Sequence, residues 1–323
     1  MLGGEDGQPA FRVGADRRPV VAGGLVCRVP LTSLACPSCG APLPGSARWA
    51  TTTCSFCGAT VANQQRLVSA AEYHAALARD GLGAAGAVTV RDHRWQVHGR
   101  LGSGTQGEVL LVSRARRLTE YGVAHVLRDG ADPAALERTW STLSALARST
   151  AQGAAVFSRR LPAPVDRGPF GGGPPAVILS HPYGYTHDLS GLRRLLPGGL
   201  DPRHVVWIWR RALEVLGFVH ASGYVHGNVR AEHLLLDAAD HGAMLVGWSS
   251  ARRDDDTAAD LAALSGALRS VCPAPPAPLE RLLDDAPGFA AWTLLERVAV
   301  VARGLYGPPA FVPLLLPGHP PPR

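Results

Sequence analysis

From Val88 onward, the apolar residues first follow the pattern of strands and later the spacing of helices. Strands are predicted around 95–97, 107–112, 121–129, 155–160, 176–179 and 243–246. In the helix predicted for Pro133–Ala147, a Pro stands at the start and four apolar residues recur on one face. These are Leu136, Trp140, Leu143 and Leu146. Strands gathered before helices predict an α+β fold.

A longer helix is predicted for Asp201–Ser222, because apolar residues recur there at helical spacing. Within it, Trp207 and Trp209 are expected to belong to the core. A shorter helix is predicted from Ser69, where a capping box with Glu72 begins, to Gly81. The residues from 274 onward read as a short set of helices before a proline-rich end.

Composition limits the possible classes of protein. With 323 residues, 46% of them hydrophobic, the chain has room for a buried core and for two domains or a domain with a small module. The net charge of +6 is not gathered in one basic block, so nucleic-acid or membrane binding has little support. The chain contains no lysine, and all 32 basic residues are Arg. No reaction that needs a buried ammonium group is therefore expected.

No targeting or membrane signal is apparent in the sequence. The N-terminus lacks a basic segment followed by an apolar one, so no signal peptide is predicted. No run of 18 apolar residues occurs, because charged residues interrupt the best candidates. We therefore expect a cytoplasmic protein without a membrane partner, in which thiols stay reduced and paired cysteines favour metal over disulfides.

Four cysteines form two C-x2-C pairs separated by 14 residues: Cys36, Cys39, Cys54 and Cys57. Two such pairs can complete a tetrahedral site for one Zn²⁺ ion, which would supply the folding energy that so small a segment lacks. The alternative is two disulfides or a redox pair. A closed set of four thiolates predicts a structural zinc ion, and the segment resembles the zinc ribbons of many bacterial regulatory proteins.

A glycine-rich stretch lies between two predicted strands, with Gly102, Gly104, Gly107 and Val109 in the pattern G-x-G-x-x-G-x-V. No helix follows the third Gly, which favours a hairpin that covers phosphates over a dinucleotide-binding fold. A glycine-rich hairpin without a ligand remains the alternative.

Val225–Leu236 contains His-Gly-Asn followed by an apolar strand. This stretch resembles the catalytic loop of protein kinases, H-R-D-x-x-x-x-N. The glycine stretch, the strand at 121–129 and the helix that carries Asp260 near its start follow the same family in the right order. The resemblance covers about 90 to 310. It implies a two-lobed kinase fold, with a sheet in the N-terminal lobe and a shortened helical C-terminal lobe in which Asp260 braces the loop.

At five chemical positions the chain departs from the kinase pattern: His125, Thr139, Asn228, His233 and Gly247. The resemblance implies that these positions replace the phosphate-binding Lys, its partner Glu, the catalytic Asp, the metal-binding Asn and the metal-binding Asp. A carboxamide cannot act as the base, and glycine cannot hold Mg²⁺. Only ten residues separate Ser249 from Asp260, which is too short for a working activation segment.

The resemblance therefore implies a pseudokinase, an inactive scaffold or allosteric regulator in bacterial phospho-signalling. The resemblance to bacterial zinc-ribbon kinase-like proteins also implies possible partners, namely a von Willebrand A-type protein, a phosphatase or an active kinase. Mg²⁺ is not expected, and ATP binding through Gly102, Gly104, Gly107 and Val109 stays open. Two alternatives remain, namely an atypical kinase or other ATP-dependent phosphotransferase, and a nucleic-acid-binding protein acting through the ribbon.

The predicted division of the chain has five parts. They are a disordered leader at 1–24, a zinc ribbon at 25–62, a helix and linker at 63–87, a kinase-like domain at 88–312 and a proline-rich tail at 313–323.

Overall fold

The computed structural model describes residues 86–114, 120–180, 185, 187–238 and 240–314, together with five short strands before them. Contacts within the chain divide it into two compact units, Met1–Gly81 and Leu82–Arg323. Within the described part, no helix combines the length and the apolar character that a bilayer span requires.

In the first unit, β1 (Leu31–Ala35) pairs antiparallel with β2 (Pro42–Leu43) and with β5 (Arg66–Val68). β3 (Thr52–Thr53) pairs with β4 (Thr60–Val61). In sequence order, one C-x2-C pair falls between β1 and β2 and the other between β3 and β4. The four predicted zinc ligands, the leader at 1–24 and the helix predicted from Ser69 lie outside the described residues.

The second unit begins with a six-stranded antiparallel sheet in the order β10-β11-β9-β8-β7-β6. In chain order its strands are β6 (Gly86–Val90), β7 (His93–Ser103), β8 (Gly107–Arg114), β9 (Glu120–Leu127), β10 (Pro164–Pro169) and β11 (Pro175–Ser180). The sheet curls, because Gly171 between its last two strands donates from its backbone N–H to the Thr89 carbonyl of β6 at 2.9 Å. Trp95 and Ile178 are fully buried in the resulting core.

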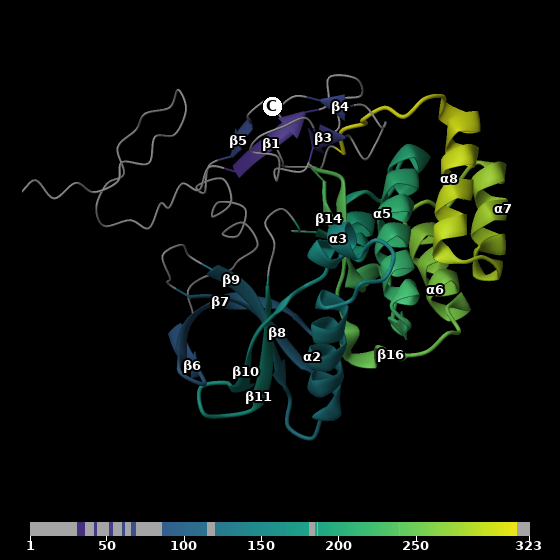
Figure 1. The fold of residues 1–323 in the computed structure, drawn as a ribbon. Coiled ribbons are helices and arrows are strands. Elements are labelled where there is room, and N and C mark those ends of the chain that lie inside the picture. The colour runs from purple at the N-terminus through teal and green to yellow at the C-terminus, as the bar shows by residue number, and fades with distance from the viewer. Residues whose placement is uncertain are drawn as a thin grey trace, which may run out of the picture. The chain divides into compact units, whose positions relative to one another are not determined.

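Helix α2 (Ala134–Ala147) crosses beside this sheet (Figure 1). The predicted apolar face is confirmed toward the end of the helix, where Leu143 and Leu146 are buried, whereas Leu136 and Trp140 are partly buried. The helix contacts β10 and β11 on one side and the segment around Trp248 on another. It is therefore the element that links the sheet to the residues following β15.

The strand predicted over 155–160 is wrong. This segment forms α3 (Ala154–Phe157) and the 3-10 turn η1 (Ser158–Arg160). Gly153 precedes it with φ +87°, a left-handed conformation that redirects the chain, and Val156 is 55% exposed. A short apolar run cannot distinguish strand from helix. The partner of β11 is instead β10, which the sequence pattern did not indicate because prolines stand at both of its ends.

The rest of the second unit is helical apart from short strand pairs. The helices are α4 (Leu189–Leu195), α5 (Pro202–Ala221), α6 (Ala258–Arg269), α7 (Ala277–Asp285) and α8 (Ala291–Tyr306). The 3-10 turn η4 (Ala286–Gly288) joins α7 to α8. Figure 1 shows α5 among the other helices, which agrees with its almost wholly buried residues. The Asp201 carboxylate caps it by accepting from the Arg203 N–H at 2.8 Å, and Trp207 and Trp209 lie in the core as predicted.

Short strands frame the loop at 226–233, of which one precedes α4 and four lie between α5 and α6. They are β12 (His187–Asp188), β13 (Tyr224–Val225), β14 (Leu234–Asp237), β15 (Gly242–Leu245) and β16 (Arg252–Arg253). β14 pairs with β12 and β15, and β13 pairs with β16. Two 3-10 turns, η2 (Ala231–His233) and η3 (Trp248–Ser250), lie next to these strands. Residues 226–233 therefore connect β13 to β14. Each of these strands is paired with other strands, so the loop is fixed at both ends.

Candidate functional site

The loop at 226–233 is anchored by one buried carboxylate. Asp260, in the first turn of α6, accepts from the backbone N–H of His226 at 2.7 Å and of Gly227 at 2.8 Å. It also accepts from the His220 ring at 3.1 Å. Burial alone would raise the pKa of Asp260, but these hydrogen bonds outweigh burial and lower it. The expected role of Asp260 as the brace of this loop is confirmed.

His226 is fully buried and connects the loop to the segment after β15. Its Nε2–H donates to the Val246 carbonyl at 3.0 Å, and its Nδ1 accepts from the Asn228 N–H at 3.3 Å. The ring meets the edge of Trp248 at a centroid distance of 4.5 Å. Burial lowers the pKa of His226 to about 4, so the ring is neutral near pH 7 and keeps one donor and one acceptor.

His233 and Gly247 fit each other. Gly247 has φ +83°, and a Cβ placed on it would lie 2.7 Å from the His233 ring. The imidazole therefore fills the space that any side chain at 247 would need. His233 also donates from Nδ1 to the Asn228 carbonyl at 2.8 Å. The two substitutions are complementary, and His233 has a structural role that the sequence pattern did not reveal.

Asn228 is held through its backbone from both sides, by His226 at its N–H and by His233 at its carbonyl. Its neighbour Gly227 has φ +72°, and a Cβ there would approach the Ser250 carbonyl to 2.7 Å. A residue larger than glycine at 227 would push against η3. The backbone of the loop is thus held by His226 and His233 and lies close against η3.

His125 and Thr139 do not form an equivalent of the kinase Lys–Glu pair. His125 lies on β9 between Val109 of β8 and Val177 of β11. Burial, together with a smaller contribution from the nearby His233, lowers the pKa of His125 to about 4. Thr139 is buried, and its hydroxyl donates to the Ala135 carbonyl at 2.9 Å within its own helix. Both groups are neutral, so neither brings a fixed charge to the site.

The neighbouring acid Glu137 is 66% exposed and pairs with Arg167 at 2.8 Å. It is therefore an exposed surface acid paired with an arginine. Asp237 lies at the opposite end of the β14–β15 hairpin from Gly247, because it pairs with Gly242 while Leu234 pairs with Leu245. Three residues of strand separate the two ends by roughly 10 Å, so Asp237 is not placed to replace a carboxylate at 247.

One link to this site was missed by the sequence pattern. The Arg138 guanidinium on α2 donates to the Ser249 carbonyl at 2.7 Å and to Asp132 at 2.9 Å. Arg138 therefore joins α2 to the segment that follows Gly247, a link that does not depend on a Lys–Glu pair. No motif identified Arg138, since the bond runs to a backbone atom 111 residues away.

In the glycine-rich hairpin, the glycines meet different surroundings. The Gly104 N–H donates to the Gly107 carbonyl at 2.9 Å and closes the turn. A Cβ on Gly107 would lie 2.0 Å from the Val126 carbonyl oxygen, whereas a Cβ on Gly102 or Gly104 would meet no atom within 4 Å. The fold itself requires Gly107. The other two glycines leave open space beside the hairpin.

This difference predicts the outcome of alanine substitutions in the hairpin. Gly107→Ala is expected to lower the free energy of unfolding by about 2 kcal/mol, because the backbone of β8 or β9 must move. Gly104→Ala, the matched control, should change it by less than about 0.5 kcal/mol. Urea unfolding followed by tryptophan fluorescence measures both. Equal effects of the two substitutions would contradict the role assigned to Gly107.

Acid is expected to weaken the second unit before the carboxylates titrate. Burial lowers the pKa of His226 to about 4 and that of His241 to about 3. Because the unfolded forms titrate near 6.5, the unfolded chain binds more protons between pH 6.5 and 4, and stability falls as the pH falls through this window. Each ring should lower the free energy of unfolding by about 1 to 2 kcal/mol between pH 6.5 and 5.

Urea titrations at these two pH values test the acid effect. In His226→Gln, the slope of stability against pH should be smaller by up to one proton than in the unmodified chain. An unchanged slope would show that His226 does not carry this effect.

No family model matches the sequence, and no curated protein matches it. Solved protein-kinase structures do resemble the fold. The structure of vaccinia related kinase 3 has a TM-score of 0.56 at 15% identity and covers 73% of this chain and 95% of that one. The kinase domain of Mycobacterium tuberculosis PknI has a TM-score of 0.52 at 21% identity, with coverage of 68% and 99%. The BubR1 kinase domain has a TM-score of 0.54 at 12% identity, covering 69% and 84%. The chain therefore has the α+β fold of protein kinases.

Proposed function

We propose that this chain is a pseudokinase: a cytoplasmic kinase-fold protein that binds other proteins and does not transfer phosphate. It would act as a scaffold or allosteric regulator in a bacterial phospho-signalling system. The observation that carries the proposal is the His233 ring lying in the space that a side chain at Gly247 would occupy. A carboxylate at 247 would have to displace this imidazole, so the position is built for the absence of a metal ligand.

The other positions support the same conclusion. Phosphoryl transfer needs a cation on the phosphates, a base for the hydroxyl and carboxylates for Mg²⁺. His125 stands on the strand of the missing cation, and its low pKa leaves it neutral near pH 7. Asn228 offers a carboxamide in place of the base. What remains is a loop braced by Asp260, in which His226 and His233 bond to the backbone of Asn228.

The zinc ribbon is part of the proposal. Each C-x2-C pair falls in sequence between two strands that pair with each other, an order that suits two cysteine pairs sharing one Zn²⁺. Such a small module would depend on its metal to fold. Together with the kinase-like unit, it favours protein partners such as a von Willebrand A-type protein, a phosphatase or an active kinase.

Two measurements test the proposal: transfer of phosphate from ATP, and the melting temperature in the presence of ATP. Purified protein is expected to move no labelled γ-phosphate to itself or to generic protein substrates, with Mg²⁺ or Mn²⁺ present. Its melting temperature with ATP should be the same with and without Mg²⁺. Transfer that disappears in Asn228→Ala or His125→Ala, or stabilisation that requires Mg²⁺, would refute the proposal and favour an atypical kinase.

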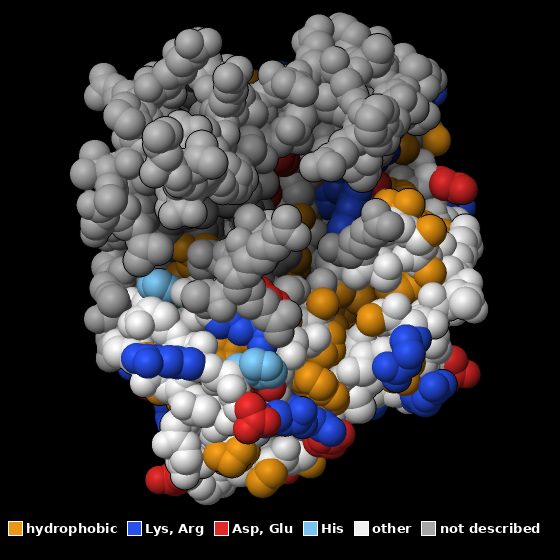
Figure 2. Space-filling model, turned by 60° about the vertical axis from the view of Figure 1, so that its left-hand side comes forward, with side chains coloured by type: hydrophobic (Ala, Val, Ile, Leu, Met, Phe, Trp, Pro, Cys, Tyr) orange, Lys and Arg blue, Asp and Glu red, His pale blue; other side chains and the backbone are white. Residues whose placement is uncertain are grey.

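The atypical kinase is the second candidate, because the open space at Gly102 and Gly104 is compatible with a phosphate group. A nucleic-acid role has less support. Figure 2 shows basic side chains in separate groups with acidic ones beside them on the coloured part of this face. Many arginines are paired, such as Arg269 with Glu280 and Asp284. Binding that falls steeply with salt would favour the nucleic-acid role.

A further inference from the structure

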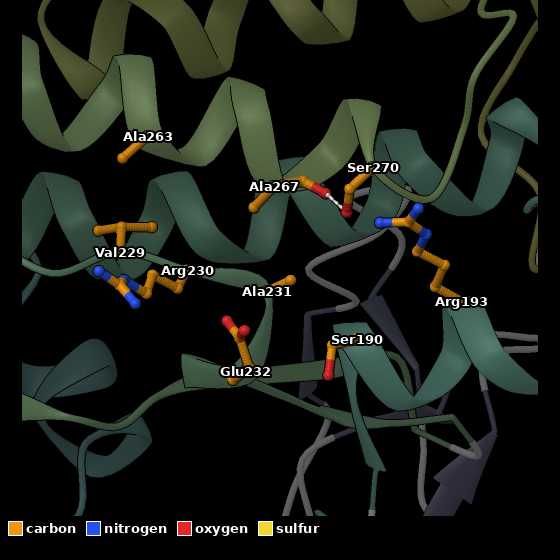
Figure 3. A pocket seen from close by; sticks show the side chains of 9 residues that line it. All are labelled: Ser190, Arg193, Val229, Arg230, Ala231, Glu232, Ala263, Ala267 and Ser270. Carbon is orange, nitrogen blue, oxygen red and sulfur yellow. Dashed lines mark hydrogen bonds between the residues drawn. The ribbon is translucent and has the colours of Figure 1, made fainter. Parts of the chain in front are cut away.

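A cavity of about 340 Å³ lies beside the braced loop, between that loop, α4 and α6 (Figure 3). It is lined by Ser190, Arg193, Val229, Arg230, Ala231, Glu232, Ala263, Ala267 and Ser270. The cavity is open on the α6 side because the side chains there, Ala263 and Ala267, are small. The volume suits two or three side chains of a ligand.

The charged groups at this cavity are free to bind a ligand. Among the described residues, neither the Arg193 nor the Arg230 guanidinium has a hydrogen-bond or ion-pair partner, and both residues are exposed. Figure 3 shows the two guanidiniums at opposite sides of the cavity, with Glu232 on the loop between them. A ligand that satisfies both arginines therefore needs two anionic groups set apart, with no anionic group facing Glu232.

The two hydroxyls add a second requirement. The Ser190 hydroxyl donates its proton to Asp188 at 2.7 Å and accepts one hydrogen bond from the Arg194 guanidinium at 3.2 Å, which leaves it one further lone pair. Ser270 donates its proton to the Ala267 carbonyl at 2.6 Å. Their oxygens can then only accept further hydrogen bonds, as can Glu232. The ligand must offer N–H donors as well as separated anions. An extended peptide with spaced acidic side chains has both, whereas a continuous run of phosphates meets Glu232 unfavourably.

We propose that this cavity binds an acidic segment of a partner protein, with Asp or Glu side chains on Arg193 and Arg230 and backbone N–H groups on Ser190, Ser270 and Glu232. Only ten residues separate Ser249 from Asp260, so little of the chain at this point is available to cover the loop. The inference rests on the proposed function, in that the segment is bound and not phosphorylated.

The probe is a fluorescein-labelled peptide, capped Ala-Glu-Ala-Ala-Ala-Glu-Ala, measured by anisotropy with the full-length protein. Saturable binding with half-saturation below about 1 mM is expected, and the same peptide with Gln in place of Glu should bind at least tenfold more weakly. Arg193→Gln and Arg230→Gln should each weaken binding at least tenfold. Arg281→Gln, which removes an exposed charge from α7, should leave it within twofold.

Glu232→Gln has the opposite expected sign, because it removes repulsion toward acidic side chains. Binding should become about two- to fivefold tighter. All these side chains are exposed, so a melting curve for each variant should match the unmodified protein. Absence of saturable binding, equal weakening by Arg281→Gln, or preference for an oligonucleotide of equal charge would overturn the proposal. A phosphoryl-transfer assay is independent of these outcomes, so failure here leaves the proposed lack of activity unaffected.

Discussion

Replacing Asp260 with alanine is expected to lower the free energy of unfolding by about 4 kcal/mol. The carboxylate is 2% exposed and accepts three hydrogen bonds, from His226 N–H, Gly227 N–H and the His220 ring. Removing it leaves a buried donor, the His226 N–H, and a partly buried one, the Gly227 N–H, unsatisfied. The loop at 226–233 would then lose its link to α6.

Urea unfolding reports this loss directly, because every tryptophan except Trp49 lies in the second unit. Asp255→Ala is the matched control, since Asp255 is exposed just before the same helix and should matter by less than about 0.5 kcal/mol. A loss below about 1 kcal/mol for Asp260→Ala would mean that the loop is held by other contacts.

Gly247→Ala is expected to lower the free energy of unfolding by about 3 kcal/mol. A left-handed φ costs a residue with a Cβ about 1 kcal/mol or more. The new methyl would also displace the His233 ring and break its hydrogen bond to the Asn228 carbonyl. The lost packing and the lost hydrogen bond should each cost about 1 kcal/mol more. The substitution tests the steric complementarity on which the proposed function rests.

A double-mutant cycle separates the two contributions. In a His233→Ala background, only the backbone strain of Gly247→Ala remains, so its cost should fall to about 1 kcal/mol. Gly266→Ala on α6 is the control, because its added methyl meets no atom within 4 Å and a helical Gly→Ala change should stabilise by up to about 1 kcal/mol. Additive losses at 233 and 247 would show that the two residues do not interact.

Much of the fold could be predicted from the sequence because its signals are local. The helix over Asp201–Ser222 has a capping Asp, a Pro in its first turn and apolar residues at helical spacing, and it appears as α5 (Pro202–Ala221). The strands at 107–112 and 176–179 appear within β8 and β11. The strand prediction failed at 155–160, where six residues are too few to show a period and Gly153 redirects the chain.

The candidate site was only partly predictable. The motif order placed the loop 226–233 and its brace Asp260, because both rest on spacing along the chain. It presented His233 and Gly247 as two separate losses, yet the structure makes them one steric pair. It gave no indication of Arg138 bonding to Ser249, or of a cavity between α4 and α6. These contacts join residues far apart in sequence and involve backbone atoms, which leave no pattern in the residue types.

The sequence by itself determined which groups are available: no lysine in the chain, no carboxylate at 247 and no base at 228. It also determined the helix that appears as α5 and the strands that appear within β8 and β11, since capping and periodicity act over a few residues. Only the tertiary structure decided which groups face each other, how far burial shifts the pKa of His125 and His226, and which arginines remain unpaired within the described residues. Those properties depend on solvent exclusion and on distances across the fold, and neither is fixed until the chain is packed.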